Sequence, residues 1–198
     1  MTPSTQLLAQ IDWSGQLRAL ASRFGHRIAA RDGAGAHLSY ADLSARAHAV
    51  AAHLLGLGLR PGDPVASLLP NSLEAIWLSY CLKLAGLAEV PLGWGYTADE
   101  IRWCARVSGA KILITREART ALAVEAGLQP LMSTSIPLHD SGATLPPVPG
   151  TTPGRILFTS GTTGRPKGVV ASHARRWMGE QLQKACLPFM PQPGSKSC

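Results

Sequence analysis

The stretch "LFTSGTTGRPKGVV", residues 157–170, raises the main question about this chain of 198 residues. Three glycines, one proline, four hydroxyl residues and one lysine stand between two short apolar runs. Short apolar runs bounded by turn residues are typical of buried strands. A flexible hairpin or linker is the simplest alternative, but a spacer has no need of four hydroxyls, spaced glycines and a lysine. We therefore interpret the stretch as a functional loop between two strands.

The residues of this loop suit a phosphate group. Gly161 and Gly164 permit positive φ angles and let the backbone approach a ligand closely, so successive free N–H groups can form an anion-binding nest. Lys167 adds a mobile positive charge. The hydroxyl groups that can donate further hydrogen bonds belong to Thr159, Ser160, Thr162 and Thr163.

The spacing differs from that of a Walker A loop, which reads G-x-x-x-x-G-K-[ST]. Counted from Gly161, the sixth position is Pro166, and the residue after Lys167 is Gly168 in place of a serine or threonine. A second short strand, "GVVAS", follows where the Walker A loop would lead into a helix. The sequence therefore predicts a phosphate-binding loop of another class.

Upstream of the loop, apolar strands alternate with helices of ten or more residues. The helical period is clear over residues 39–58, and strands are expected over 64–70, 87–92, 111–115 and 130–134. Residues 116–127 are expected to be helical, and so is the segment after the loop, from His173 to about Cys186. The expected helix starts pair a capping residue with an acid three positions on: Ser39 with Asp42, Asn71 with Glu74, and Thr97 with Glu100.

Such alternation indicates βαβ units and an α/β fold with a mainly parallel sheet. Residues 140–153, "DSGATLPPVPGTTP", lack periodicity and are rich in proline and glycine, which indicates a loop or a boundary. We therefore expect an α/β subdomain over residues 1–139, the loop over 140–153, and a phosphate-loop segment over 154–198.

The formal net charge of +7 is concentrated near the loop. Residues 1–140 hold 12 Lys+Arg and 11 Asp+Glu, whereas residues 141–198 hold 7 Lys+Arg and one acid, Glu180. No basic run exceeds Arg175-Arg176 and no aromatic residues interleave with it, so we expect no nucleic-acid partner. The excess charge fits either a surface that further chain would neutralise or a site for a small polyanion.

Cysteine usage and hydropathy narrow the class of protein. The four cysteines are scattered without a C-x-x-C pair, which favours buried free thiols over a zinc site or a disulfide framework. The isolated histidines lack metal-ligand spacing, so no metal site is expected. No run of eighteen apolar residues occurs and the N-terminus lacks a signal-peptide pattern. We therefore expect no transmembrane segment and a cytoplasmic location.

The loop also resembles a known signature. Residues 159–168 match the pattern T-S-G-T-T-G-x-P-K-G of the AMP-forming, adenylate-forming superfamily, which includes acyl-CoA synthetases, peptide-synthetase adenylation domains and luciferases. The segments "LSYADLSARAHAVAAHLLGLGLRPGDPVASLLPNS" and "KLAGLAEVPL" resemble the same family upstream. The resemblance runs from about Phe24 to about His173. It implies an incomplete N-terminal part of the large domain of an adenylate-forming enzyme.

The resemblance implies a reaction with two halves. A carboxylic acid and ATP, with Mg²⁺, would give an acyl-adenylate and pyrophosphate, and a thiol would then take the acyl group. Coenzyme A is the expected thiol, as in fatty-acid activation, because the match begins close to Met1; a phosphopantetheine carrier is the alternative. By the same resemblance the β- and γ-phosphates would be held by Thr159, Ser160, Gly161, Thr162, Thr163, Gly164 and Lys167.

Several family features are absent or altered. Ser172 and His173 match the family's S-H-x-N, but Arg175 replaces the asparagine, which favours a polar helix start over a catalytic histidine. Trp94 is interpreted as a packing residue. Family members are much longer, and the catalytic lysine of their C-terminal domain has no counterpart here. Two non-enzymatic alternatives therefore stay open: a vestigial fragment, or a nucleotide- or polyphosphate-binding module without chemistry.

Overall fold

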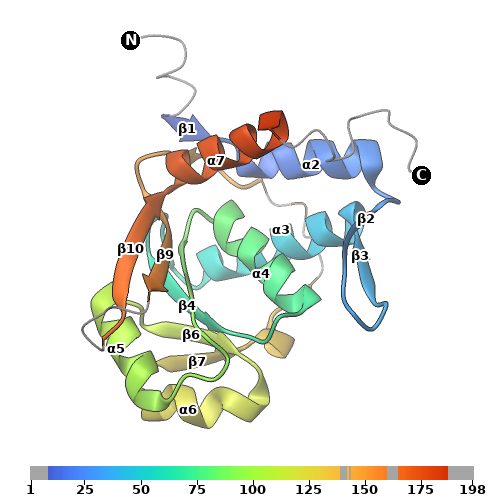
Figure 1. Ribbon diagram of the computed structural model, residues 1–198. Coiled ribbons are helices and arrows are strands. Elements are labelled where there is room, and N and C mark those ends of the chain that lie inside the picture. The colour runs from blue at the N-terminus through green and yellow to red at the C-terminus, as the bar shows by residue number, and fades with distance from the viewer. Residues whose placement is uncertain (1–8, 139–141, 143, 160–164, 187–198) are drawn as a thin grey trace.

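The computed structural model describes residues 9–138, 142, 144–159 and 165–186, arranged as three layers with a sheet between two groups of helices (Figure 1). The central sheet has the strand order β10-β9-β5-β4-β6-β7. Its strands are β4 (Pro64–Leu68), β5 (Ala88–Pro91), β6 (Ile112–Thr115), β7 (Gln129–Met132), β9 (Pro153–Thr159) and β10 (Lys167–Ser172). All neighbouring strands pair in parallel except β9 and β10, which are antiparallel. This confirms the predicted α/β fold with a mainly parallel sheet.

Each face of the sheet is covered by its own helices. One hydrophobic cluster joins the sheet to α2 (Trp13–Phe24), α3 (Tyr40–Gly56) and α4 (Leu73–Leu84). The other joins it to α5 (Ala98–Ser108) and α6 (Thr120–Glu125). Helix α7 (His173–Cys186) leads away from β10 and lies near α2 (Figure 1). Alternation along β4 explains the two clusters, because Val65 packs in the first and Ala66 in the second.

The helix starts follow their capping residues. Ser39 and Asp42, and likewise Thr97 and Glu100, form reciprocal capping boxes as predicted. The predicted cap Asn71 is wrong by one residue, since the Ser72 side chain accepts the hydrogen bond from the Ala75 N–H. The serine lies three positions before that N–H, the spacing that an N-cap requires.

Smaller elements complete the fold. The predicted strand 130–134 is shifted, because Ser133–Ser135 forms a 3₁₀ helix after β7. Another 3₁₀ turn, Glu117–Arg119, precedes α6 within the segment expected to be helical. Two small antiparallel pairs, β1 with β8 and β2 with β3, were not predicted from the sequence. Their bounds are β1 (Gln10–Ile11), β8 (Val148–Pro149), β2 (Ile28–Arg31) and β3 (His37–Ser39).

Candidate functional site

The hairpin of β9 and β10 carries both ends of the glycine-rich loop. Thr159, the last residue of β9, pairs in register with Lys167, the first residue of β10. The Thr159 hydroxyl lies 3.5 Å from the Lys167 carbonyl oxygen, to which it donates, and both residues are exposed. The two predicted strands around the loop are thus confirmed. The other five predicted phosphate-binding residues, Ser160 to Gly164, lie outside the described residues.

The direction of Lys167 follows from strand alternation. Ile156 and Phe158 pack toward α5 and α6, so Leu157 and Thr159 point to the opposite face of the sheet. Lys167 pairs with Thr159 and shares its face. A cation and a hydroxyl are therefore presented together at the carboxyl end of β9. In open α/β sheets ligands bind at the carboxyl ends of the parallel strands.

The segment just before Lys167 is held by helix α5. The indole Nε1–H of Trp103 donates a hydrogen bond of 3.0 Å to the carbonyl oxygen of Pro166. Two guanidinium groups lie over the Trp103 ring, that of Arg165 at 4.5 Å and that of Arg106 at 4.6 Å from the ring centroid. No sequence signal marked Trp103, because it stands in the apolar pattern of an ordinary amphipathic helix.

The third glycine of the motif has a packing role. A Cβ atom on Gly168 would lie 3.3 Å from the Ile156 Cγ2 atom and 3.4 Å from the Phe158 Cε1 atom. Gly168 pairs with Phe158 across the hairpin. A side chain at residue 168 would therefore press on the cluster beneath α5. Close packing within the hairpin accounts for a glycine at this position.

His173 lies at the other end of β10, away from the loop. Its side chain is buried, and its Nδ1 atom accepts a hydrogen bond of 3.0 Å from the Trp13 indole N–H. Burial, aided by the nearby Arg176 charge, lowers the pKa of His173 to about 4. The preceding Ser172 hydroxyl accepts from the Arg175 N–H at 3.3 Å and caps α7. The matched Ser-His pair therefore begins a helix here, as the sequence analysis favoured.

A buried charged cluster ties β5, β9 and α7 together. Glu89 on β5 accepts from Arg155 Nε at 2.9 Å and from the Ser79 hydroxyl at 3.0 Å. Arg176 on α7 reaches the same carboxylate oxygen at 3.5 Å and also donates to the Gly154 carbonyl at 2.7 Å. Nearby, the buried Lys83 pairs with Glu180 of α7 at 2.8 Å. Since Glu89 and Arg155 lie early in their strands, this cluster is structural and distant from the loop.

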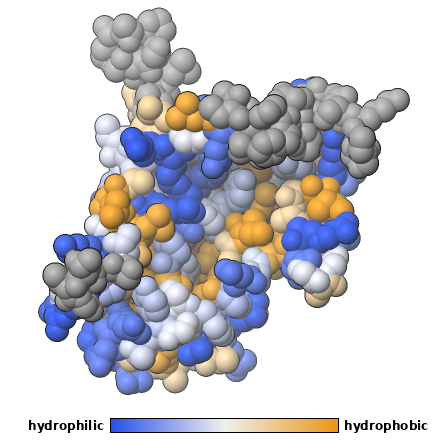
Figure 2. Space-filling view, viewed as in Figure 1, coloured by the Kyte–Doolittle hydropathy of each residue, from blue (hydrophilic) through white to orange (hydrophobic). Residues whose placement is uncertain are grey.

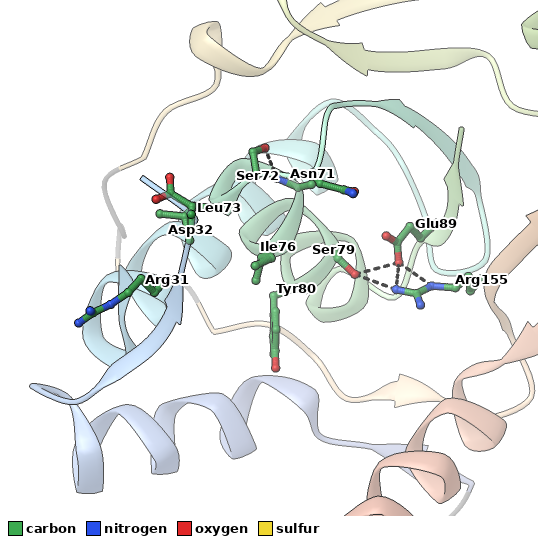
Figure 3. Close-up of a pocket in the computed structure, with 12 residues that line it drawn as sticks. Arg31, Asp32, Asn71, Ser72, Leu73, Ile76, Ser79, Tyr80, Glu89 and Arg155 are labelled. Carbon is green, nitrogen blue, oxygen red and sulfur yellow. Dashed lines mark hydrogen bonds and ion pairs between the residues drawn. The ribbon is translucent and has the colours of Figure 1, made fainter. Parts of the chain in front are cut away.

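Beside this cluster is a cavity of about 610 Å³ that runs along one face of α4 (Figure 3). In that view Ser79, Glu89 and Arg155 form a hydrogen-bonded group on one side, while Ile76 and Tyr80 project from the helix. The Glu89 carboxylate and the Arg155 guanidinium satisfy each other there. The cavity includes neither Thr159 nor Lys167 among its lining residues.

The described residues also bear on the predictions about cysteines, metal sites and membrane spans. Cys81 and Cys104 are buried free thiols, as expected, and burial raises the pKa of Cys104 to about 11. No cluster of three or more His, Cys, Asp or Glu side chains suited to a metal ion occurs among the described residues. None of the helices in this part of the chain combines the length and apolar character that crossing a membrane requires.

The sequence of the chain matches a known protein family. Residues 17–187 match the family described as AMP-binding enzyme. The chain is 33% identical over 188 residues to phosphinothricin tripeptide synthetase PhsB of Streptomyces viridochromogenes. The aligned region covers 90% of this chain and 16% of PhsB. It is 35% identical over 151 residues to a feruloyl-CoA synthase of Amycolatopsis, over 75% of this chain and 30% of that protein. The chain thus spans less than a third of either relative.

The fold is shared with solved structures of the same kind. ATP-bound MatB from Rhodopseudomonas palustris superposes with a TM-score of 0.75 and 28% identity, over 88% of this chain and 37% of the MatB chain. The family match over residues 17–187 includes β9 and β10, the strands on either side of the loop signature. Together with the signature itself, it confirms the resemblance found in the sequence. The chain belongs to the family of AMP-binding enzymes and has the fold of an N-terminal part of its adenylate-forming members.

Proposed function

We propose that this chain supplies the phosphate-binding part of an enzyme that activates a carboxylic acid with ATP and passes the acyl group to a thiol. The observation that carries the proposal is the register of the hairpin, which places Lys167 opposite Thr159 at the carboxyl end of β9. Both residues belong to the signature T-S-G-T-T-G-x-P-K-G. We extend the phosphate-binding role to the remainder of the loop, Ser160 to Gly164, by the family resemblance.

The proposed role of Lys167 follows from where charge develops. In the first half-reaction the carboxylate attacks the α-phosphate, and the bond to the leaving pyrophosphate breaks. A fixed cation and hydroxyl beside the departing phosphates stabilise the negative charge that accumulates there. Among the described residues no acidic side chain forms an ion pair with Lys167, and its side chain is exposed. Its charge is therefore available for a polyanion.

Magnesium would arrive with the nucleotide. Mg²⁺ is usually bound by one or two carboxylates together with substrate phosphates. The described residues that directly flank the loop in sequence are Thr159, Arg165, Pro166 and Lys167, which offer no carboxylate. We therefore assign no metal ligand among the described residues and propose that the ion is held by ATP phosphates and by residues outside the described part.

Two thiols are proposed as acceptors of the acyl group. One relative is named for a coenzyme A thioester and another for a tripeptide. Coenzyme A is the first candidate to test, and a carrier-bound phosphopantetheine is the second. A role in fatty-acid metabolism and a cytoplasmic location are also proposals.

The test separates the two half-reactions in a complete enzyme, built by joining residues 1–186 to the corresponding remainder of MatB. Lys167→Ala is expected to slow acyl-adenylate formation by about 30- to 1000-fold, the cost of losing one charged donor at a developing oxyanion. Thioester formation from supplied acyl-adenylate is expected to change little, because pyrophosphate is absent from that step. Quenched-flow measurement of each step decides.

The control is Lys111→Ala, which removes an exposed lysine next to the amino end of β6, three strands away from β9 in the sheet. Equal losses in both half-reactions for Lys167→Ala would mean that the loop acts as a structural hinge. Polyphosphate binding without any acid-dependent reaction would instead favour the alternative of a binding module without chemistry.

A further inference from the structure

We infer that Trp103 of α5 is a positioning residue for Lys167. The inference rests on the proposed function, since it concerns how the phosphate-binding lysine is aimed. Its basis is one contact between elements far apart in the sequence: the Trp103 indole N–H donates to the Pro166 carbonyl at 3.0 Å. Pro166 directly precedes Lys167, so this hydrogen bond fixes the backbone at the point where β10 begins.

The second contact fixes the residue before Pro166. The Arg165 guanidinium lies 4.5 Å from the Trp103 ring centroid, within the range of a cation–π interaction. Arg106, one turn further along α5, lies 4.6 Å from the same ring. The indole therefore holds Arg165 through its ring and Pro166 through its N–H. A leucine or alanine at residue 103 could do neither.

Because side chains alternate along a strand, the contacts of Trp103 with Arg165 and Pro166 also set the direction of the Lys167 side chain. The Pro166 carbonyl is held against α5, on the face of the sheet to which Phe158 also packs. Lys167 begins β10 and pairs with Thr159, whose side chain points to the opposite face. With residue 166 fixed on one face, the lysine side chain is presented on the other, beside the Thr159 hydroxyl. Without the contacts of Trp103, the first residue of this edge strand is free to fray.

Trp103 itself is held firmly enough for this role. It is half-buried and packs against the hydrophobic cluster of α5, α6 and the sheet. Helix α5 is stabilised at its start by the capping box of Thr97 and Glu100 and at its end by Gly109, whose φ of +79° is left-handed. The hydrogen-bond donor therefore stands on a rigid element, whereas its acceptor stands at the end of a loop.

The experiment measures tripolyphosphate binding to the full chain by titration calorimetry at low ionic strength. Trp103→Phe keeps an aromatic ring for Arg165 but removes the N–H donor, and it is expected to weaken binding about fivefold, which corresponds to about 1 kcal/mol. The matched control is Trp94→Phe, because Trp94 also carries an arginine, Arg119, 4.6 Å from its ring centroid. That control is expected to bind as the unmodified chain does.

A double-mutant cycle distinguishes positioning from general support. In a Lys167→Ala background, Trp103→Phe is expected to cause no further loss, because the lysine that it aims is already gone. The same fivefold loss in both backgrounds, or no loss in either, would overturn the inference while leaving the proposed function intact. A chain whose tripolyphosphate binding is unaffected by Lys167→Ala would overturn both.

A measurement on the unmodified chain covers the case in which Trp103→Phe does not fold. The Trp103 indole N–H resonance is expected to exchange slowly with solvent and to shift on addition of tripolyphosphate, because its acceptor adjoins the bound lysine. The Trp94 indole resonance is expected not to shift. An unshifted Trp103 resonance at saturation would contradict the coupling between Trp103 and Lys167.

Discussion

The buried His173 should make the stability of this chain depend on pH. Its pKa of about 4 in the folded chain compares with 6.5 for an unperturbed histidine. Below pH 6.5 residue His173 is protonated in the unfolded chain but stays neutral in the folded chain, so the free energy of unfolding falls as the pH drops. The decrease from this one group is about 3 kcal/mol between pH 7 and pH 4, at about 1.4 kcal/mol per pKa unit. Below pH 4 both states are protonated and its contribution ends.

The assay is urea denaturation at intervals from pH 7.5 to pH 4, followed by far-ultraviolet circular dichroism. His173→Asn is expected to lower stability at pH 7, because the Trp13 indole loses its acceptor. Its stability should then fall much less steeply between pH 6.5 and pH 4 than that of the unmodified chain. His26→Asn, at an exposed position, is the control and should keep the original slope. Parallel curves for the unmodified chain and His173→Asn would refute the reasoning.

Three further outcomes are expected. Glu89→Gln removes the carboxylate that Arg155 and Arg176 contact, and it should lower the free energy of unfolding, measured by chemical denaturation, by about 2–3 kcal/mol. A loss no larger than that caused by the exposed Glu125→Gln would contradict the role of the cluster. Gly168→Ala should lower the melting temperature, whereas Gly179→Ala, whose added Cβ meets nothing within 4 Å, should not; equal shifts would remove the packing explanation. The chain alone should show no acid-dependent pyrophosphate exchange, because one loop cannot supply the positioning worth roughly 7–11 kcal/mol; robust exchange would show that it is a complete catalyst.

The exposed side of the hairpin bears on how the chain behaves in solution. Apolar atoms gather over the hairpin (Figure 2), where Leu157, Val169 and Val170 are 45%, 56% and 59% exposed. Strand β10 lies at the edge of the sheet and pairs only with β9 among the described strands. An apolar edge of this kind favours association with another chain or segment. Size-exclusion chromatography with dye binding measures it, and a compact monomer that binds no dye would contradict the expectation.

Much of the fold followed from local sequence signals. Capping residues such as Ser39 and Thr97, together with the regular alternation of apolar runs, predicted the helices and strands of the sheet. The apolar runs on either side of the loop predicted β9 and β10 themselves, but not their antiparallel pairing as a hairpin. These signals are short-range, and short-range rules are what a single sequence carries most directly.

The contacts that position the site could not be predicted, because they join residues far apart in the chain. Trp103 meets Pro166 across 63 residues and Trp13 meets His173 across 160. Glu89 stands inside an apolar run and gave no sign that Arg155 would pair with it. The role of Gly168 was also hidden, since a glycine in a phosphate-binding signature suggests ligand contact before strand packing. Such pairings depend on the tertiary fold and not on local pattern.

Lys167 and its loop are proposed to bind a chain of phosphates, and titration calorimetry of tripolyphosphate into the unmodified chain measures that binding. We expect saturable binding that Lys167→Ala weakens about tenfold or more, since a charge-assisted hydrogen bond contributes about 1.5–3 kcal/mol. Lys111→Ala makes the same change of net charge beside the amino end of β6, and it is predicted to leave the affinity nearly unchanged. Equal losses from the two lysine variants, or no saturable binding by the unmodified chain, would show that Lys167 and its loop do not form a phosphate site.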